Sequence, residues 1–344
     1  MNPILKSNGK SLVQKANFYY FRISNLSYEE TFRLLFIILA SILSFFVFDA
    51  LRFRSYLIMT DVPVISYSNF SIMLLGLIIV HYSKWAVNYL CRDFVYRTIS
   101  KQYQGEFRDV RVKKILKWLF DGVYYSTTSI LCWYFFHEEP WYPNGLGGTN
   151  YTSIWQDFPN MINNKWVIPF YMIQTANHLY ALIHLAIKRK EVETKYWEYM
   201  LHHTLATCLL IFSALYNQFR FGIVVLGIHD IADIILSLSR AQHDLKSIKS
   251  LMYIQYVLLL FTWIYTRVII FPQIILEAIM HYQNYPEATW GNKYLIVQMC
   301  ILFGMHLYWT YFMMQIGINV FKKGKKYEEI NTYDNKEILK QGRN

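Results

Sequence analysis

Charged residues are scarce in this chain. They make up 17% of its 344 residues, whereas an average soluble protein carries about 25%. Hydrophobic residues make up 54% and aromatic residues 18%, and the apolar residues come in long runs. This composition argues against the pair of soluble domains that the length alone would allow. The net charge of +11 collects in the loops between the runs, as in membrane proteins, so no nucleic acid is expected as a partner.

Cysteine is also sparse. The four residues are Cys91, Cys132, Cys208 and Cys300, and they form neither a CxxC pair nor the spacing of a disulfide framework. All lie in or beside apolar runs, where buried structural thiols are expected.

Sorting signals and repeats are lacking as well. Residues 1–28 are basic and contain no acid, but no compact apolar segment precedes a small-residue cleavage site, so no cleavable signal peptide is expected. A basic start without acids is also typical of mitochondrial targeting segments, which keeps a mitochondrial membrane as an alternative location. No internal repeat and no soluble domain are recognised.

Eight apolar segments approach or exceed the length that crosses a bilayer core, which is about 20 residues of helix. They are Leu34–Ala50, Ile72–Cys91, Ile115–Phe136, Val167–Ile187, Tyr199–Tyr216, Phe221–Ser239, Met252–Met280 and Tyr294–Phe321. The first is short for a span. The seventh is long and contains Pro272, which predicts a kink or a tilt. The fold class expected is an all-α, polytopic membrane bundle of about eight transmembrane helices.

Basic residues predict which side of the membrane each loop faces. With eight spans both termini share a face, and that face receives residues 1–33, 92–114, 188–198, 240–251 and the tail from Lys322. These segments hold 26 of the 34 Lys and Arg residues, and the opposite loops hold five. The asymmetry predicts that both termini are cytoplasmic. On the opposite face the sequon at Asn150 is the better glycosylation candidate, because that at Asn69 lies almost at the membrane.

Two apolar segments carry ionisable groups where such groups are expensive, which makes them a functional-site hypothesis. The fifth contains His202-His203, and the sixth contains His229-Asp230 and Asp233. A tight turn around residues 217–220 makes the two segments antiparallel neighbours. At about 1.5 Å per residue, His203 and Asp233 then lie at similar depth on the cytoplasmic side. His229 and Asp233 are four residues apart and share a helix face.

A carboxylate beside an imidazole fixes the tautomer of the ring and stabilises its protonated form. Such a histidine is a competent general base or a nucleophile in acyl transfer. An amine that attacks a thioester must lose a proton, so a buried His/Asp pair suits that reaction. The cytoplasmic depth suits acyl-CoA, whose charged part must remain in water. The alternatives are polar packing between helices and a zinc or iron site. Because the HxxHH boxes of di-iron membrane enzymes are absent, no metal ligand is assigned.

Other polar residues in the segments need partners. Arg267 lies mid-membrane and requires an acid, for which Asp230 and Asp233 are both candidates. The remaining groups are interpreted as helix-packing hydrogen bonds or snorkelling charges; they are His81, Lys84, Asp121, His178 and His306.

The pattern resembles the Lag1 motif of the TLC (TRAM–LAG1–CLN8) domain family, in its ceramide synthase branch. The matching positions are His202-His203, Phe212-Ser213, Asn217, Arg220, Gly222, His229-Asp230, Asp233 and Leu236, without gaps. Outside the motif, Arg267 with Phe271-Pro272 is similar to the family's Arg…Phe-Pro element, and 306–309 is similar to its His-x-aromatic-Trp element.

The resemblance implies a four-part chain. Residues 1–33 are a cytoplasmic segment, 34–112 hold two N-terminal transmembrane helices and a basic loop, 113–323 form a six-helix TLC domain, and 324–344 are a cytoplasmic tail. The membrane implied is the endoplasmic reticulum. Lys195, Ser237 and Arg240 depart from the family's usual residues, which leaves partner binding, regulation and chain-length choice open.

The activity implied is transfer of a fatty acyl group from acyl-CoA to the amine of a sphingoid base. The catalytic residues expected are His202, His203, Asp230 and Asp233, and the supporting ones are His229, Asn217, Arg220, Arg267 and His306. Acyl-CoA is a co-substrate and no cofactor is expected. Membrane lipids, acyl-CoA, the sphingoid base and a homodimer, heterodimer or larger membrane complex are the partners. The alternative is a non-enzymatic TLC protein that binds lipid or serves as a structural subunit.

Overall fold

The computed structural model describes residues 28–62, 64–99, 104–142, 152–187, 196–243, 245, 249–284 and 290–323. Within these ranges the chain is helical, with turns, short loops and one isolated β-bridge between Ile99 and Leu245, and it contains no strand. Several predictions lie outside the described residues. They are those on the N-terminal segment before Tyr28, the Asn150 sequon, Lys195 and the tail after Lys323.

Every apolar segment predicted from the sequence lies in a helix. The helices are α2 (Tyr28–Met59), α3 (Phe70–Thr98), α4 (Gly105–Phe136), α5 (Val167–Ile187), α6 (Tyr196–Leu215), α7 (Phe219–His243), α8 (Lys249–Trp263), α9 (Phe271–Asn284) and α10 (Trp290–Lys323). A π-helical segment, Ile264–Ile270, joins α8 to α9, so these three correspond to the seventh predicted segment. Two 3₁₀ turns, Tyr67–Asn69 and Thr152–Trp155, lie in the connections. The all-α helical bundle is therefore confirmed.

Four helical stretches of the described residues are long and apolar enough to cross a membrane by length and composition. They are Tyr67–Thr98, Phe219–Gln242, Leu251–Tyr282 and Trp290–Asn319. The helices α5 and α6 carry polar residues in their apolar runs, among them Gln174, Asn177, His202 and His203. These residues lower mean hydropathy without shortening the helix. The chain is an integral membrane bundle, and the count of eight spans stays a prediction.

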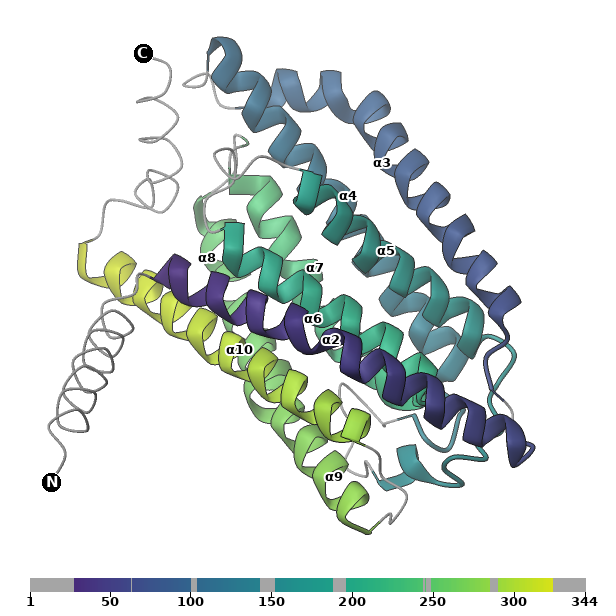
Figure 1. Cartoon of the computed structure of the whole chain (residues 1–344). Helices are drawn as coiled ribbons and strands as arrows, with labels where there is room; N and C mark the ends of the chain where they lie inside the picture. Colours follow the sequence, from purple (N-terminus) through teal and green to yellow (C-terminus); the bar gives the residue numbers. More distant parts are fainter. Residues whose placement is uncertain are drawn as a thin grey trace, which may run out of the picture.

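The helices pack as two connected groups. On one side α3 lies against α4 and α5, and α4 packs along α7; on the other, α2 and α10 pack against each other and against α6 (Figure 1). The outward faces carry large exposed apolar side chains, as Leu74, Leu75 and Ile78 do on α3 and Val257 and Phe261 on α8. Bilayer lipid would cover such faces, because a helix pairs its backbone polar groups internally and presents only its apolar side chains to the lipid.

The first helix is longer than the sequence analysis predicted. The predicted segment ended at Ala50, next to Asp49, whereas α2 continues to Met59. Asp49 is buried and accepts hydrogen bonds from the Tyr216 hydroxyl at 2.7 Å and from the backbone N–H of Gly291 at 2.8 Å. Arg54 is also buried, and its guanidinium donates to the Ile65 carbonyl. Charged residues that find partners inside the bundle do not end the helix.

The predicted tight turn between α6 and α7 is confirmed. Asn217 has a positive φ of 60°, which asparagine tolerates better than most residues, and its side-chain amide donates to the Pro159 carbonyl at 2.9 Å. The next amide, that of Gln218, reaches back to the Ser213 carbonyl at 2.7 Å and closes the end of α6. The two helices are therefore antiparallel neighbours.

A π-helical segment, Ile264–Ile270, precedes Pro272, where the sequence predicted a kink or a tilt. The N–H of Phe271 bonds to the Thr266 carbonyl five residues back rather than four. A proline offers no N–H and crowds the preceding turn, so a wider turn at this point is a physical consequence of Pro272. Arg267 lies within the wide turn, and single π turns inside helices are frequent at functional sites.

Gly222 occupies a position at which a side chain does not fit. A Cβ at Gly222 would lie 2.3 Å from the Tyr171 hydroxyl oxygen and 2.6 Å from a ring carbon, whereas one at Gly304 would meet nothing within 4 Å. Tyr171 is fully buried and hydrogen-bonded to Ser213, so it cannot move away freely. We expect Gly222→Ala to lower the free energy of unfolding by about 1–3 kcal/mol.

The measurement is the apparent melting temperature of the detergent-purified variant, followed by size-exclusion chromatography after heating. Gly304→Ala is the matched control, because it makes the same substitution in a helix without a clash. Equal melting temperatures for the two variants would contradict the packing argument.

Candidate active site

Four helical elements place their ionisable groups at one site. His202 and His203 lie in the second turn of α6, His229 and Asp233 on α7, Arg267 in the π-helical segment, and His306 on α10. The helix α6 contacts α7 and α10, and the π-helical segment also contacts α7 and α10. His229 and His306 contact each other, and His306 also contacts Arg267. His202 joins this cluster through the Trp309 ring, which lies 5.2 Å from the His202 ring and 6.3 Å from that of His306.

Arg267 and Asp233 form the charged centre of this cluster. A guanidinium nitrogen, Nη2, lies 2.6 Å from the Asp233 carboxylate and also donates to the His229 carbonyl at 3.1 Å. The Arg267 side chain is only 2% exposed, and its guanidinium stacks 4.2 Å from the Trp263 ring centre. The acid that the sequence left open is therefore Asp233 rather than Asp230. A buried arginine requires such a partner because it does not shed its proton.

Hydrogen-bond partners fix the tautomers of two histidines. His229 Nδ1 lies 2.7 Å from the Val225 carbonyl oxygen, which can only accept, so Nδ1 carries the proton and Nε2 keeps a lone pair. His306 Nε2 lies 3.2 Å from Arg267 Nη1, which can only donate, so the proton of His306 is on Nδ1. Both outer nitrogens, His229 Nε2 and His306 Nδ1, are buried without a protein partner. The two rings, 5.0 Å apart, offer one acceptor and one donor for a bound molecule.

His202 contacts Trp309, and a buried acid fixes the position of that tryptophan. The edge of its ring meets Trp309 at a centroid distance of 5.2 Å, and the Trp309 indole N–H donates to the carboxylate of Glu198. Glu198 is buried one turn before His202 on α6. This contact orients the tryptophan against the imidazole, while His202 Nδ1 has no protein partner. The sequence analysis did not single out Glu198, although an acid one turn before a histidine pair in an apolar segment was a readable signal.

His203 faces a different part of the bundle. Its ring lies 5.3 Å from that of His202, and its electrostatic neighbours include His178 of α5, Lys117 of α4 and Lys84 of α3. Its Nδ1 is likewise buried without a protein partner. His202 therefore belongs to the arginine cluster, and His203 lies between that cluster and the basic residues of α3 and α4.

Asp230 is held away from the histidines. Its carboxylate accepts hydrogen bonds from the Thr128 hydroxyl and the Gln174 amide, both at 2.8 Å, and Tyr124 in turn donates to Gln174 at 2.8 Å. Asp230, Thr128 and Gln174 are all buried. This carboxylate joins α7 to α4 and α5. The sequence analysis missed Thr128 and Gln174, although a glutamine inside the apolar run of α5 was a detectable signal.

Two predicted supporting residues lie at the other end of α7. Arg220 donates to the Asn163 side chain at 3.1 Å and to the carbonyls of Gln156 and Ile162 at 3.1 Å and 2.7 Å. Asn217 bonds to the same loop, at Pro159. Nine residues separate Arg220 from His229, which is about 14 Å of helix. The structure thus assigns loop-anchoring contacts to both residues and does not bring them to the histidine cluster.

A set of cations lies beside the cluster on its predicted cytoplasmic side. Lys84 lies 4.9 Å from the Phe120 ring and 4.7 Å from that of Tyr180. Lys117 and Arg240 lie 4.4 Å and 4.5 Å from the Trp118 ring. Asp121 is within electrostatic range of all three cations, yet none of them forms an ion pair among the described residues. We call Lys84, Lys117 and Arg240 the basic mouth.

The donor set of the cluster offers little to a metal ion. Outside the Asp230 network, the carboxylate of Asp233 is bound to Arg267 and that of Glu198 accepts a hydrogen bond from Trp309. Across the part of the chain that the structure describes, no group of three or more His, Cys, Asp or Glu side chains is arranged to hold a metal ion.

The family model described as the TLC domain, TRAM–LAG1–CLN8, matches residues 114–315. The match covers more than half of the chain, so the protein belongs to the TLC-domain family. Within that family it lies in the Lag1-like branch of the ceramide synthases.

Curated relatives give the same assignment at low identity. Ceramide synthase 4 of Mus musculus is 28% identical over 184 residues, which are 52% of this chain and 45% of that protein. Ceramide synthase hyl-1 of Caenorhabditis elegans is 24% identical over 229 residues, 62% of this chain and 59% of the relative. Ceramide synthase 1 LOH3 of Arabidopsis thaliana is 24% identical over 273 residues, 72% of this chain and 86% of the relative. The chain spans about half the length of the two animal relatives.

Proposed function

We propose that this protein is an N-acyltransferase that moves a fatty acyl group from acyl-CoA to the amine of a sphingoid base and so makes ceramide. The observation that carries the proposal is the buried histidine cluster, whose outer ring nitrogens have no protein partner. Buried polar groups are normally hydrogen-bonded, so unpartnered imidazole nitrogens on three helices indicate a site built for a bound molecule. The names of the relatives support the same reaction.

The reaction needs one bond made and one bond broken. The amine nitrogen attacks the thioester carbonyl, the C–N bond forms, the C–S bond breaks, and the proton that the amine loses must reach the departing thiolate. One of His202 or His203 acts as general base or as the nucleophile that accepts the acyl group first. The lone pair of His229 Nε2 is a second proton acceptor within the cluster. Asp233 balances Arg267, so the imidazoles work beside a neutralised cation.

The basic mouth supports acyl-CoA as the donor. Lys84, Lys117 and Arg240 are cations without carboxylate ion pairs within the described ranges, and phosphates of a nucleotide-bearing thioester are suitable partners for them. Because Lys84 and Lys117 are electrostatic neighbours of His203, phosphates bound at the mouth would hold the thioester on the histidine side. The CoA part would stay in water while the acyl chain enters the bundle.

Location, partners and the rest of the site follow from the same proposal. The endoplasmic reticulum membrane is the expected location and a mitochondrial membrane the alternative. Asp230 is proposed to support the site by holding α7 against α4 and α5. Membrane lipids surround the bundle, and a dimer or a larger membrane complex is the expected assembly.

One observation favours a second candidate, a lipid-binding or structural TLC protein without activity. Both aspartates of the motif are engaged in structural contacts, Asp230 with Thr128 and Gln174 and Asp233 with Arg267. A descendant that had lost its activity could retain such contacts for stability alone. The unpartnered histidine nitrogens are not explained by that role, so we prefer the enzyme.

The decisive experiment is an assay on detergent-purified protein. A panel of acyl-CoAs of different chain lengths is supplied with a sphingoid base, and the amide product is detected by mass spectrometry. We expect a product that depends on both substrates and on one range of chain lengths. Folded protein that makes no amide with any chain length, with native lipids restored, would favour the non-enzymatic candidate.

A further inference from the structure

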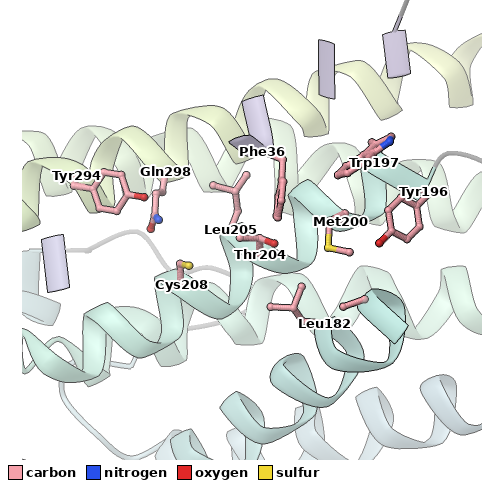
Figure 2. A pocket seen from close by; sticks show the side chains of 11 residues that line it. Phe36, Leu182, Tyr196, Trp197, Met200, Thr204, Leu205, Cys208, Tyr294 and Gln298 are labelled. Atoms are coloured by element: carbon pink, nitrogen blue, oxygen red, sulfur yellow. The ribbon is translucent and has the colours of Figure 1, made fainter. Parts of the chain in front are cut away.

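A cavity of about 390 Å³ lies against α6, and no histidine is among the residues that line it. Figure 2 shows these lining side chains. The walls of the cavity come from four helices and consist of Phe36 (α2), Leu182 and Ala186 (α5), Tyr196, Trp197, Met200, Thr204, Leu205 and Cys208 (α6), and Tyr294 and Gln298 (α10). On α6, Trp197, Met200, Thr204 and Cys208 recur at spacings of three and four residues and so form one stripe. At about 100° per residue, His202 and His203 point to the opposite half of the helix.

The cavity is shaped for a chain rather than for a compact ligand. The stripe from Trp197 to Cys208 spans about 16 Å of helix. The cavity therefore follows the axis of α6, which is expected to cross the membrane from one face to the other. Its walls are almost entirely apolar. The volume of about 390 Å³ lies at the lower end of the range for ligand sites, roughly 300–1,000 Å³. An apolar space of this volume that extends about 16 Å along α6 fits one alkyl chain parallel to the helix.

An exposed cation marks one end of the cavity. The Arg33 guanidinium lies 5.6 Å from the centre of the Trp197 ring, which also contacts Phe36 at 5.8 Å. Arg33 is exposed and forms no ion pair within the described residues. The orientation predicted from the loops puts this end of α2 and α6 on the cytoplasmic side. Arginine at that depth is suited to the phosphate of a lipid headgroup.

We propose that this cavity binds one acyl chain of an anionic glycerophospholipid of the cytoplasmic leaflet, with its phosphate at Arg33. The site differs from the proposed substrate site, because it uses the other face of α6 and is lined by no residue of the basic mouth. It is also formed partly by α2, which lies outside residues 114–315 that match the TLC domain. The proposal does not depend on the N-acyltransferase activity.

The test uses the full-length protein in liposomes of phosphatidylcholine with a trace of a photoreactive lipid that carries a diazirine on one acyl chain. Phosphatidylglycerol and phosphatidylcholine probes are compared, and adducts are mapped by proteolysis and mass spectrometry. We expect adducts concentrated on residues 197–208 of α6 and around Phe36. The anionic probe should exceed the neutral one by about fivefold, the effect of one arginine near a lipid headgroup.

Two kinds of variant make the test specific. Thr204→Trp fills the cavity and should lower labelling at least about tenfold, because the loss of two or three buried methylenes is sufficient for that change. Ala186→Phe narrows the cavity from an exposed position on α5 and serves if Thr204→Trp does not fold. Arg33→Gln should remove the preference for the anionic probe. The matched control is Lys293→Gln, which removes an exposed cation 4.6 Å from the Trp290 ring at the other end of the bundle. It should change neither the amount of labelling nor the preference for the anionic probe.

Three results would overturn the proposal. Labelling that is unchanged in the folded cavity-filling variants would show that the chain binds elsewhere. Adducts spread equally over the exposed face of α3 would indicate ordinary contact with bulk lipid. Displacement of the probe by stoichiometric acyl-CoA or sphingoid base would make the cavity part of the substrate path. The assay of adducts is independent of ceramide formation, so its failure and that of the proposed enzyme activity are distinguishable.

Discussion

Replacing His202 and His203 together by alanine is expected to lower the rate of amide formation by about 10²–10⁴-fold, the contribution typical of a positioned acid–base group. The chain should still fold, because neither ring has a hydrogen bond in the described structure and each Nδ1 is without a partner. The measurement is the initial rate of ceramide formation at saturating acyl-CoA, detected by mass spectrometry. An active double variant would remove both histidines from the mechanism.

The control for this experiment is the variant His137→Ala. His137 is exposed and lies against Trp133, away from both the arginine cluster and the basic mouth. We expect the rate of this variant to equal that of the unmodified protein. The single variants His202→Ala and His203→Ala then separate the roles. A histidine that accepts the acyl group should be needed for release of free CoA when no amine is present. A histidine that acts only as a base toward the amine should not be needed for that release.

Breaking the Arg267–Asp233 pair is expected to lower the stability of the protein, and removing Asp233 should cost more than removing Arg267. Asp233→Leu leaves a guanidinium 2% exposed and charged without its carboxylate, which costs about 3–5 kcal/mol. Arg267→Met leaves an aspartate whose side chain is 24% exposed and which can take up a proton, so its cost should be smaller. The double variant should recover part of the stability lost in Asp233→Leu, because no buried charge remains.

Apparent melting temperatures of the three variants in one detergent check this order. Arg52→Met is the control, since Arg52 is 70% exposed and its contact with the buried Asp49 is long, at 3.7 Å, so its loss should cost about 0–1 kcal/mol. A double variant no more stable than Asp233→Leu would mean that the cost comes from packing rather than from an unpaired charge.

The sequence was sufficient for the helices because hydrophobic runs and loop charges are local signals. It also indicated the antiparallel α6–α7 pair, since a tight turn allows little else. The depth argument needed only the helical rise, and His202 of α6 and His229 of α7 are electrostatic neighbours in the structure. Those features depend on spacing along the chain, which is visible without coordinates.

The hydrogen-bond and ion-pair partners of the buried polar residues could not be predicted from spacing along the chain. Asp230 and Asp233 are three residues apart on one helix, yet one bonds to Thr128 and Gln174 and the other to Arg267. The choice depends on which helix lies on each side of α7 and on the wide turn that holds Arg267. The end of α2 was missed for the same reason, because Asp49 and Arg54 were interpreted as belonging to a loop while their partners lie on distant segments.

The contacts of Asp49 bear on how much of this protein can stand alone. Its carboxylate joins α2 to the hydroxyl of Tyr216 and to the first turn of α10, both of which lie within the region that matches the TLC domain. A chain shortened to residues 114–315 would therefore lose the acceptor that holds the end of α6 and the start of α10 together. In this protein α2 is therefore a structural part of the domain rather than a removable membrane anchor. A version trimmed to residues 114–315 should be harder to purify than the intact chain.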